Sequence, residues 1–112
     1  MQIVRVLDTD GNVRHGQRDG DVVRQIEGDL FGDFQVTGQP VSVAKLLVPV
    51  DPPNIFAIGK NYVEHAAETG SAVPTEPVVF IKATTSLNHP GDPIVLPGVA
   101  KTVDYECELA VI

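Results

Sequence analysis

Several residue types are scarce in this sequence, and their scarcity limits which kinds of protein it can encode. Its 112 residues include one cysteine, no tryptophan, two tyrosines and four phenylalanines. A single cysteine cannot form an internal disulfide, which favours a reducing compartment and predicts a cytoplasmic protein. Because aromatic residues are so scarce, we expect the core to consist mainly of Val, Ile, Leu and Ala.

Basic residues are also few, with 8 Lys and Arg against 15 Asp and Glu and a net charge of −7. This balance argues against a nucleic-acid partner, since such binding depends on Lys and Arg neutralising phosphates, and against docking on an anionic membrane surface. No apolar run approaches the ~20 residues of a membrane span. The first residues, which reach an acid at Asp8 without a basic region, do not resemble a secretory signal. An acidic balance suits either a metal site or a solvated acidic surface.

The first fifty residues predict a small β-rich module. Turn chemistry at Thr9–Asn12 and at Asp19–Asp21 separates short runs of alternating apolar and polar residues. Residues 27–40 give no clear assignment. The expected strands are residues 2–7, 13–17, 22–26 and 41–48.

Three prolines, Pro49, Pro52 and Pro53, mark a boundary between this module and residues 51–112. In the second region a helix is expected over residues 62–69, because Asn61 is a suitable cap with Glu64 three residues later, and Gly70 is a suitable stop. Strands are expected on both sides of it. The fold class is therefore mostly β with short helices (α+β), with strands at residues 54–58, 78–82, 94–96 and 103–112.

Residues 103–112 contain two acids at strand spacing. In a strand, Glu106 and Glu108 would share one face roughly 7 Å apart, and a hard divalent cation would relieve their repulsion. Asp104 would share that face, although one strand rarely supplies three ligands to one ion. Cys107 would point to the opposite, packed face as a small hydrophobe.

The expected helix carries the candidate acid–base residues. His65 and Glu68 lie three residues apart and share a face, so Glu68 can orient the imidazole as a general base. A solvated surface pair is the alternative. Lys82, at the end of an apolar strand, either anchors a carboxylate or extends into water. His15 and His89 are both interpreted as surface residues.

Four segments together resemble the fumarylacetoacetate hydrolase family, in its order and at about its spacing. The resemblance is specific over residues 54–112 and loose over the first fifty residues. The matching segments are Ile58–Glu68, Pro77–Lys82, Gly91–Pro97 and Asp104–Val111.

The resemblance implies roles for individual residues. Glu106 and Glu108 would be two of three carboxylate ligands to Mg²⁺ or Mn²⁺ (Ca²⁺ in some members), the third being an aspartate on a later strand. His65 and Glu68 would be the acid–base dyad, on a helix that tends to be a mobile lid in relatives. Lys82 would bind or polarise substrate, and Tyr62 is also predicted to bind it. Lys60 departs from the leucine or arginine often found at its position.

The resemblance also implies an enzyme and an architecture. The chain is predicted to be the N-terminal part of a metal-dependent hydrolase, isomerase or decarboxylase that acts on 2-oxo acids or their enols. Its reaction would be the hydrolysis of an acylpyruvate or fumarylacetoacetate, or the isomerisation or decarboxylation of a muconate-type dioic acid from aromatic catabolism. The implied catalytic domain is a mixed β-roll that commonly forms a homodimer, and residues 51–112 would be its opening. The alternative is a non-catalytic β-rich binding or assembly module derived from the family.

Overall fold

A computed structural model of the chain describes residues 1–68 and 70–112, which are mostly β with one short α-helix. These residues form two compact units. One combines residues 1–50 with residues 88–112, and the other consists of residues 51–87. Among the described residues, no helix is long and apolar enough to cross a membrane.

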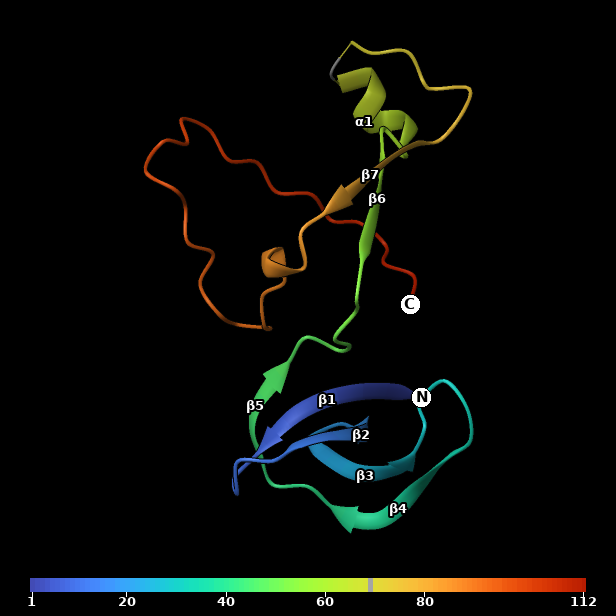
Figure 1. Ribbon diagram of the computed structural model, residues 1–112, viewed down its shortest axis with the longest axis vertical. Helices are drawn as coiled ribbons and strands as arrows, with labels where there is room; N and C mark the ends of the chain where they lie inside the picture. The colour runs from blue at the N-terminus through green and yellow to red at the C-terminus, as the bar shows by residue number, and fades with distance from the viewer. Residues whose placement is uncertain (69) are drawn as a thin grey trace. The chain divides into compact units, whose positions relative to one another are not determined.

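The first unit contains a five-stranded antiparallel sheet, which curls strongly along its length (Figure 1). The strand order is β4-β3-β2-β1-β5, so only the β1–β5 pair joins strands that are distant in sequence. The mostly β fold class predicted from the sequence is confirmed. The strands of this sheet are β1 (Gln2–Asp8), β2 (Val13–Asp19), β3 (Val22–Gly28), β4 (Phe34–Pro40) and β5 (Val43–Leu47).

The core of this sheet is small and aliphatic. Val6 is fully buried, and Val23 and Ile26 are 5% and 8% exposed. Gly16 on β2 allows the close approach of β3, because a Cβ there would collide with Val23 Cγ1 and lie 2.9 Å from the Arg24 carbonyl oxygen. The packing therefore depends on the absence of a side chain at position 16.

Residues 88–112 join the first unit through two contacts with the region of β5. The Lys45 ammonium group lies 2.6 Å from Asp92 Oδ2, and the Val48 N–H donates to Nδ1 of His89 over 3.0 Å. His89 is therefore half-buried and hydrogen-bonded rather than a surface residue. His15 lies on β2 and is also half-buried, by its cross-strand neighbours, which corrects its predicted position as a surface residue.

No strand forms in the described chain after residue 82. The strands predicted over residues 94–96 and 103–112 are therefore wrong, although these stretches are apolar and rich in β-branched residues. Such a pattern suits a pleated surface, but a strand exists only where a neighbouring strand completes its ladder. Cys107 is exposed, which corrects its predicted position on a packed face.

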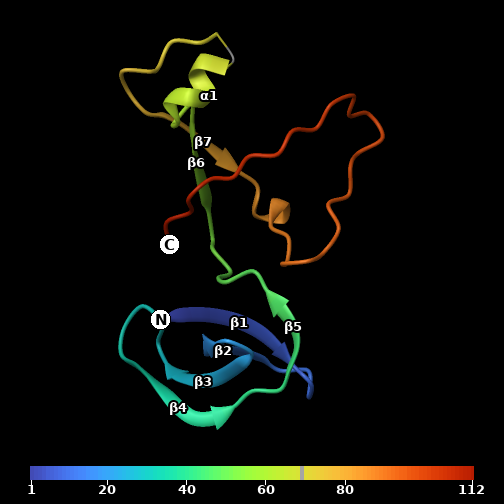
Figure 2. The same ribbon diagram turned by 180° about the vertical axis from the view of Figure 1, so that it is seen from behind.

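The second unit is a two-stranded antiparallel ribbon whose strands are joined through a helix (Figure 2). Residues directly opposite in the register share a face, which pairs Gly59 with Val78 and Ile55 with Lys82. The strands and helix predicted here are confirmed to within a residue or two, except that position 69 lies outside the described residues. The elements are β6 (Ile55–Gly59), α1 (Val63–Glu68), β7 (Val78–Lys82) and the 3₁₀ turn η1 (Thr84–Ser86).

Candidate functional site

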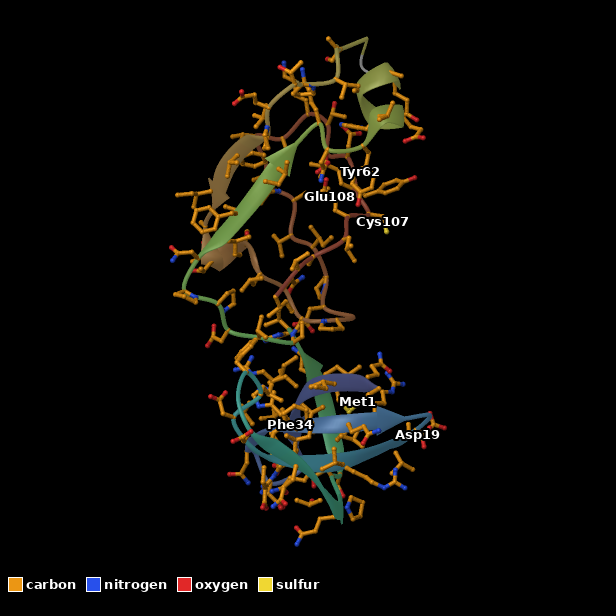
Figure 3. All side chains as sticks on the ribbon, turned by 90° about the vertical axis from the view of Figure 1, so that its right-hand side faces the viewer. Met1, Asp19, Phe34, Tyr62, Cys107 and Glu108 are labelled. Carbon is orange, nitrogen blue, oxygen red and sulfur yellow. The ribbon has the colours of Figure 1, made fainter. Side chains whose placement is uncertain are left out.

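Helix α1 carries the predicted acid–base pair. Its first backbone hydrogen bond runs from the Ala66 N–H to the Tyr62 carbonyl oxygen over 3.1 Å, so Tyr62 lies at the helix start (Figure 3). Ala66 is fully buried, whereas His65 and Glu68 are exposed. The helix therefore packs through one small residue and presents both candidate catalytic side chains on its accessible surface.

The end of α1 is closed by a left-handed glycine, as its sequence predicts. Gly70 has a φ of 64°. Its N–H donates to the Ala67 carbonyl over 3.0 Å, and the Ser71 N–H donates to the Ala66 carbonyl over 2.8 Å. These two bonds form the Schellman arrangement, which satisfies carbonyl groups that a helix end otherwise leaves without partners. A six-residue helix is too short to be stable alone, so this closure helps to fix it.

Lys82 lies at the end of β7, on the face of the ribbon that also carries Phe80. The two residues are separated by two positions, so they share a face, and Lys82 Nζ lies 6.0 Å from the centroid of the Phe80 ring. This distance is at the outer limit of a cation–π contact. The aromatic ring therefore helps to hold an exposed ammonium group near the ribbon surface.

Glu106 and Glu108 lie in an extended segment without regular secondary structure, and both are exposed. Glu108 is labelled in Figure 3. The carboxylate oxygens of both residues are the donor type that hard divalent cations take in proteins, so this pair fits two positions of such a site. Within residues 1–68 and 70–112, no three His, Cys, Asp or Glu side chains gather closely enough to hold a metal ion.

The six predicted site residues are divided between the two units. Tyr62, His65, Glu68 and Lys82 belong to residues 51–87, whereas Glu106 and Glu108 belong to residues 88–112. The ribbon of the second unit brings its four residues onto one strand–helix–strand element.

Two features of this element were missed from the sequence. Lys60, between β6 and α1, has a φ of 54°, a conformation that residues with a Cβ rarely adopt. The contact between Phe80 and Lys82 was also missed, although the spacing of two residues in a predicted strand was a sufficient signal for it.

Two family models and several known proteins match the chain. A family model described as "Fumarylacetoacetate (FAA) hydrolase C-terminal" matches residues 54–112, and a model described as "Rv2993c-like, N-terminal" matches residues 1–49. The first match covers more than half of the chain. The chain therefore belongs to the fumarylacetoacetate hydrolase family.

Individual relatives agree with this assignment. Protein Rv2993c of Mycobacterium tuberculosis is 36% identical over 121 residues, which cover 100% of this chain and 45% of that protein. A Xenopus laevis protein named "Oxaloacetate tautomerase fahd2, mitochondrial" is 46% identical over 66 residues, covering 58% of this chain and 21% of that protein. A solved structure of an uncharacterized protein from Mycobacterium abscessus matches with a TM-score of 0.71 at 40% identity, over 89% of this chain and 40% of that one.

The chain spans less than half the length of these proteins. Enzymes are found among the family's members, as the name of the Xenopus relative states, and the family generally depends on a divalent metal ion.

Proposed function

We propose that the chain is the N-terminal part of a divalent-metal-dependent enzyme that acts on 2-oxo acids or their enols. The observation that carries this proposal is the strand–helix–strand element, which presents His65 and Glu68 on the accessible surface of α1 and ends at Lys82. It occurs in a chain of the fumarylacetoacetate hydrolase family, and a relative is named for the tautomerisation of a 2-oxo acid. Mg²⁺ or Mn²⁺ is the proposed metal, with Ca²⁺ as a substitute.

The proposed chemistry begins with proton transfer at His65. In a tautomerisation, the imidazole takes a proton from the carbon next to the keto group, and the imidazolium so formed gives a proton to the enolate oxygen. In a hydrolysis, the same imidazole takes a proton from the attacking water. Glu68 would accept a hydrogen bond from the other ring nitrogen, which would fix the imidazole orientation and raise its basicity.

Lys82 and Tyr62 are proposed to bind the substrate. The Lys82 ammonium group supplies positive charge for a carboxylate or a developing enolate oxygen, and such charge is worth most where negative charge develops. Glu106 and Glu108 would hold the metal ion, together with a ligand that the family places on a later strand. When bound, a divalent cation supplies Lewis-acid stabilisation of an enolate.

Family membership also supports several wider proposals. We propose a cytoplasmic homodimer whose catalytic domain is a mixed β-roll, with a small 2-oxo acid as its substrate and without nucleic-acid or membrane partners. The proposed reactions are the hydrolysis of acylpyruvates or fumarylacetoacetate and the isomerisation or decarboxylation of 2-hydroxymuconate-type dioic acids from aromatic catabolism.

The experiment that tests the proposed function is substrate turnover by the full-length protein with Mg²⁺ or Mn²⁺ present. Oxaloacetate tautomerisation and acylpyruvate hydrolysis are measured for the wild type and for His65→Ala. We expect the rate to fall by about 10²- to 10⁴-fold, the usual contribution of a general base. Glu64→Gln, which removes an exposed charge from the same helix but keeps a side chain suited to a capping box, is the matched control and should keep its rate. No turnover by the wild type would favour the non-catalytic module, and equal measurable rates for wild type and His65→Ala would remove His65 as the general base.

A further inference from the structure

Lys60 is the one non-glycine residue with a positive φ among the described residues. At a φ of 54° its backbone is left-handed, a conformation in which the Cβ approaches the following carbonyl group. Gly59, which would adopt this conformation without cost, lies one position earlier and has no positive φ. The chain therefore holds the unfavourable conformation at a residue with a side chain, although a glycine is adjacent.

The position of Lys60 explains what this conformation does. Lys60 follows the last residue of β6, and two residues separate it from the start of α1, so the chain changes from strand to helix there. Its side chain is exposed, and packing of the lysine therefore does not account for the backbone conformation. Sparsely populated backbone conformations persist where the surrounding structure requires them, and they cluster at functional sites.

Helix α1 depends strongly on the residues at its ends. It has six residues, of which Ala66 is the buried one, so packing fixes its direction weakly. Left-handed residues flank it on both sides, Lys60 before its start and Gly70 after its end. The direction of α1 determines where His65 and Glu68 point.

We propose that Lys60 is a positioning residue whose left-handed backbone, and not its ammonium group, sets the direction of α1 and so orients the His65–Glu68 pair. The catalytic consequence rests on the proposed function, whereas the effect on helix geometry does not. The backbone conformation of Lys60 and its charge are thus two separable properties.

Four substitutions in the full-length protein separate these properties. Lys60→Gly and Lys60→Asn remove the charge but adopt the left-handed conformation readily. Lys60→Arg keeps the charge and adopts it as readily as lysine does. Lys60→Val removes the charge and resists it, since a β-branched residue with positive φ is a genuine outlier.

In oxaloacetate tautomerisation, we expect Lys60→Gly, Lys60→Asn and Lys60→Arg to keep kcat within about twofold. Lys60→Val should lose about tenfold to a hundredfold in kcat with a smaller change in KM, because displacement of a catalytic group affects the chemical step most. Loss of activity in Lys60→Gly and Lys60→Asn with retention in Lys60→Arg would show that the charge matters and would overturn the proposal. Unchanged kcat in Lys60→Val would overturn it as well.

A second measurement does not require activity. NMR Cα shifts over residues 63–68 and the Hε1 shift of His65 should change in Lys60→Val and stay constant in Lys60→Gly. If the wild type turns over neither oxaloacetate nor an acylpyruvate, the proposed function fails, and the NMR comparison still decides the positioning role. If Lys60→Val does not fold, Lys60→Thr replaces it, because threonine is also β-branched and resists the left-handed conformation; identical shifts over residues 63–68 for Lys60→Thr and Lys60→Gly would overturn the proposal.

Discussion

Asp8 and Arg14 close the first hairpin of the sheet through a hydrogen-bonded ion pair, in which Arg14 Nε lies 2.5 Å from Asp8 Oδ2. The other carboxylate oxygen of Asp8 accepts the backbone N–H groups of Asp10 and Asn12 over 3.0 and 2.7 Å. Asp8 is only 5% exposed. The hydrogen bond from Arg14, followed by that from the Asn12 backbone, lowers the pKa of Asp8 from 3.8 to about 2.

This lowered pKa predicts an acid-sensitive contribution to stability. Because the pKa is lower in the folded chain than in the unfolded one, the contribution is complete above pH 3.8 and is lost as the pH falls through about 2. Asp8→Asn removes the titrating group, so we expect its free energy of unfolding to be lower than that of the wild type at pH 5 and to approach it at pH 2. Urea denaturation at four pH values between 5 and 2 measures this, with Asp10→Asn as the exposed control. Curves of wild type and Asp8→Asn that stay parallel over this range would contradict the prediction.

Replacement by alanine should lower the free energy of unfolding at Gly16 but not at Gly38, although both glycines belong to the same sheet. A Cβ at Gly16 would collide with Val23 Cγ1, whereas a Cβ at Gly38 on β4 would meet nothing within 4 Å. We expect Gly16→Ala to lower the free energy of unfolding by about 1–3 kcal/mol, the usual cost of overpacking. Gly38→Ala is the matched control and should be neutral or slightly stabilising. Thermal and urea denaturation compare the two, and equal stabilities would show that β3 can move away from β2 at no cost.

The hydrogen bond between Val48 and His89 predicts a specific pattern of substitution. His89 Nδ1 accepts the Val48 N–H over 3.0 Å, so the proton of the neutral imidazole lies on Nε2. His89→Asn retains an acceptor at a similar position, while His89→Leu removes it. Hydrogen exchange at the Val48 amide should therefore be roughly twofold to tenfold faster in His89→Leu, corresponding to one ordinary hydrogen bond, and little changed in His89→Asn. Equally fast exchange in both variants would assign the effect to packing of the imidazole ring.

Local signals in the sequence predicted those elements whose partners lie close in the chain. The turn at Thr9–Asn12 joins β1 to β2, and Gly70 ends α1 where a left-handed residue is required. In both cases a few adjacent residues contain all the chemistry that forms the structure. The position of the candidate dyad on a helix could be predicted for the same reason.

Strands that depend on a distant or irregular neighbour could not be predicted. Residues 34–40 follow a stretch of acids and glycines and contain a glycine and a proline, which are depleted in strands, yet they form β4 because β3 supplies a ladder, with a register shift between Arg24 and Ile26. Residues 103–112 have high β-propensity and form no strand. Pairing therefore outweighs propensity in both directions. The half-burial of His89 was missed because its contact, Val48, lies 41 residues away.

The contact of Lys82 with Phe80 predicts a small and specific effect on substrate binding. At 6.0 Å from the ring centroid, a cation–π contact at an exposed site contributes about 0.5–1 kcal/mol, which corresponds to a change of about twofold to fivefold in KM. Phe80→Leu should raise KM for oxaloacetate by that factor and abolish the ring-current shift of the Lys82 ε-methylene protons. Phe80→Tyr should retain both properties. Phe56→Leu removes an aromatic ring from the other face of the ribbon and is the control; an equal rise in KM there would indicate a general effect on the ribbon.

Asp104 provides an internal control for the two proposed carboxylate ligands of the extended segment. Glu106 and Glu108 are the proposed ligands, and Asp104 is an exposed acid of the same segment without such a role. In calorimetric titration of the full-length protein with Mn²⁺, Glu106→Ala should weaken binding at least about tenfold, because a carboxylate ligand to a hard cation is lost. Asp104→Ala removes the same charge two residues away and should change the affinity little, since a solvent-exposed charge that is not a ligand acts on the ion through screened electrostatics. Equal weakening by both substitutions would mean that the segment attracts the cation by its overall charge, and unchanged affinity in Glu106→Ala would remove Glu106 from the ligand set.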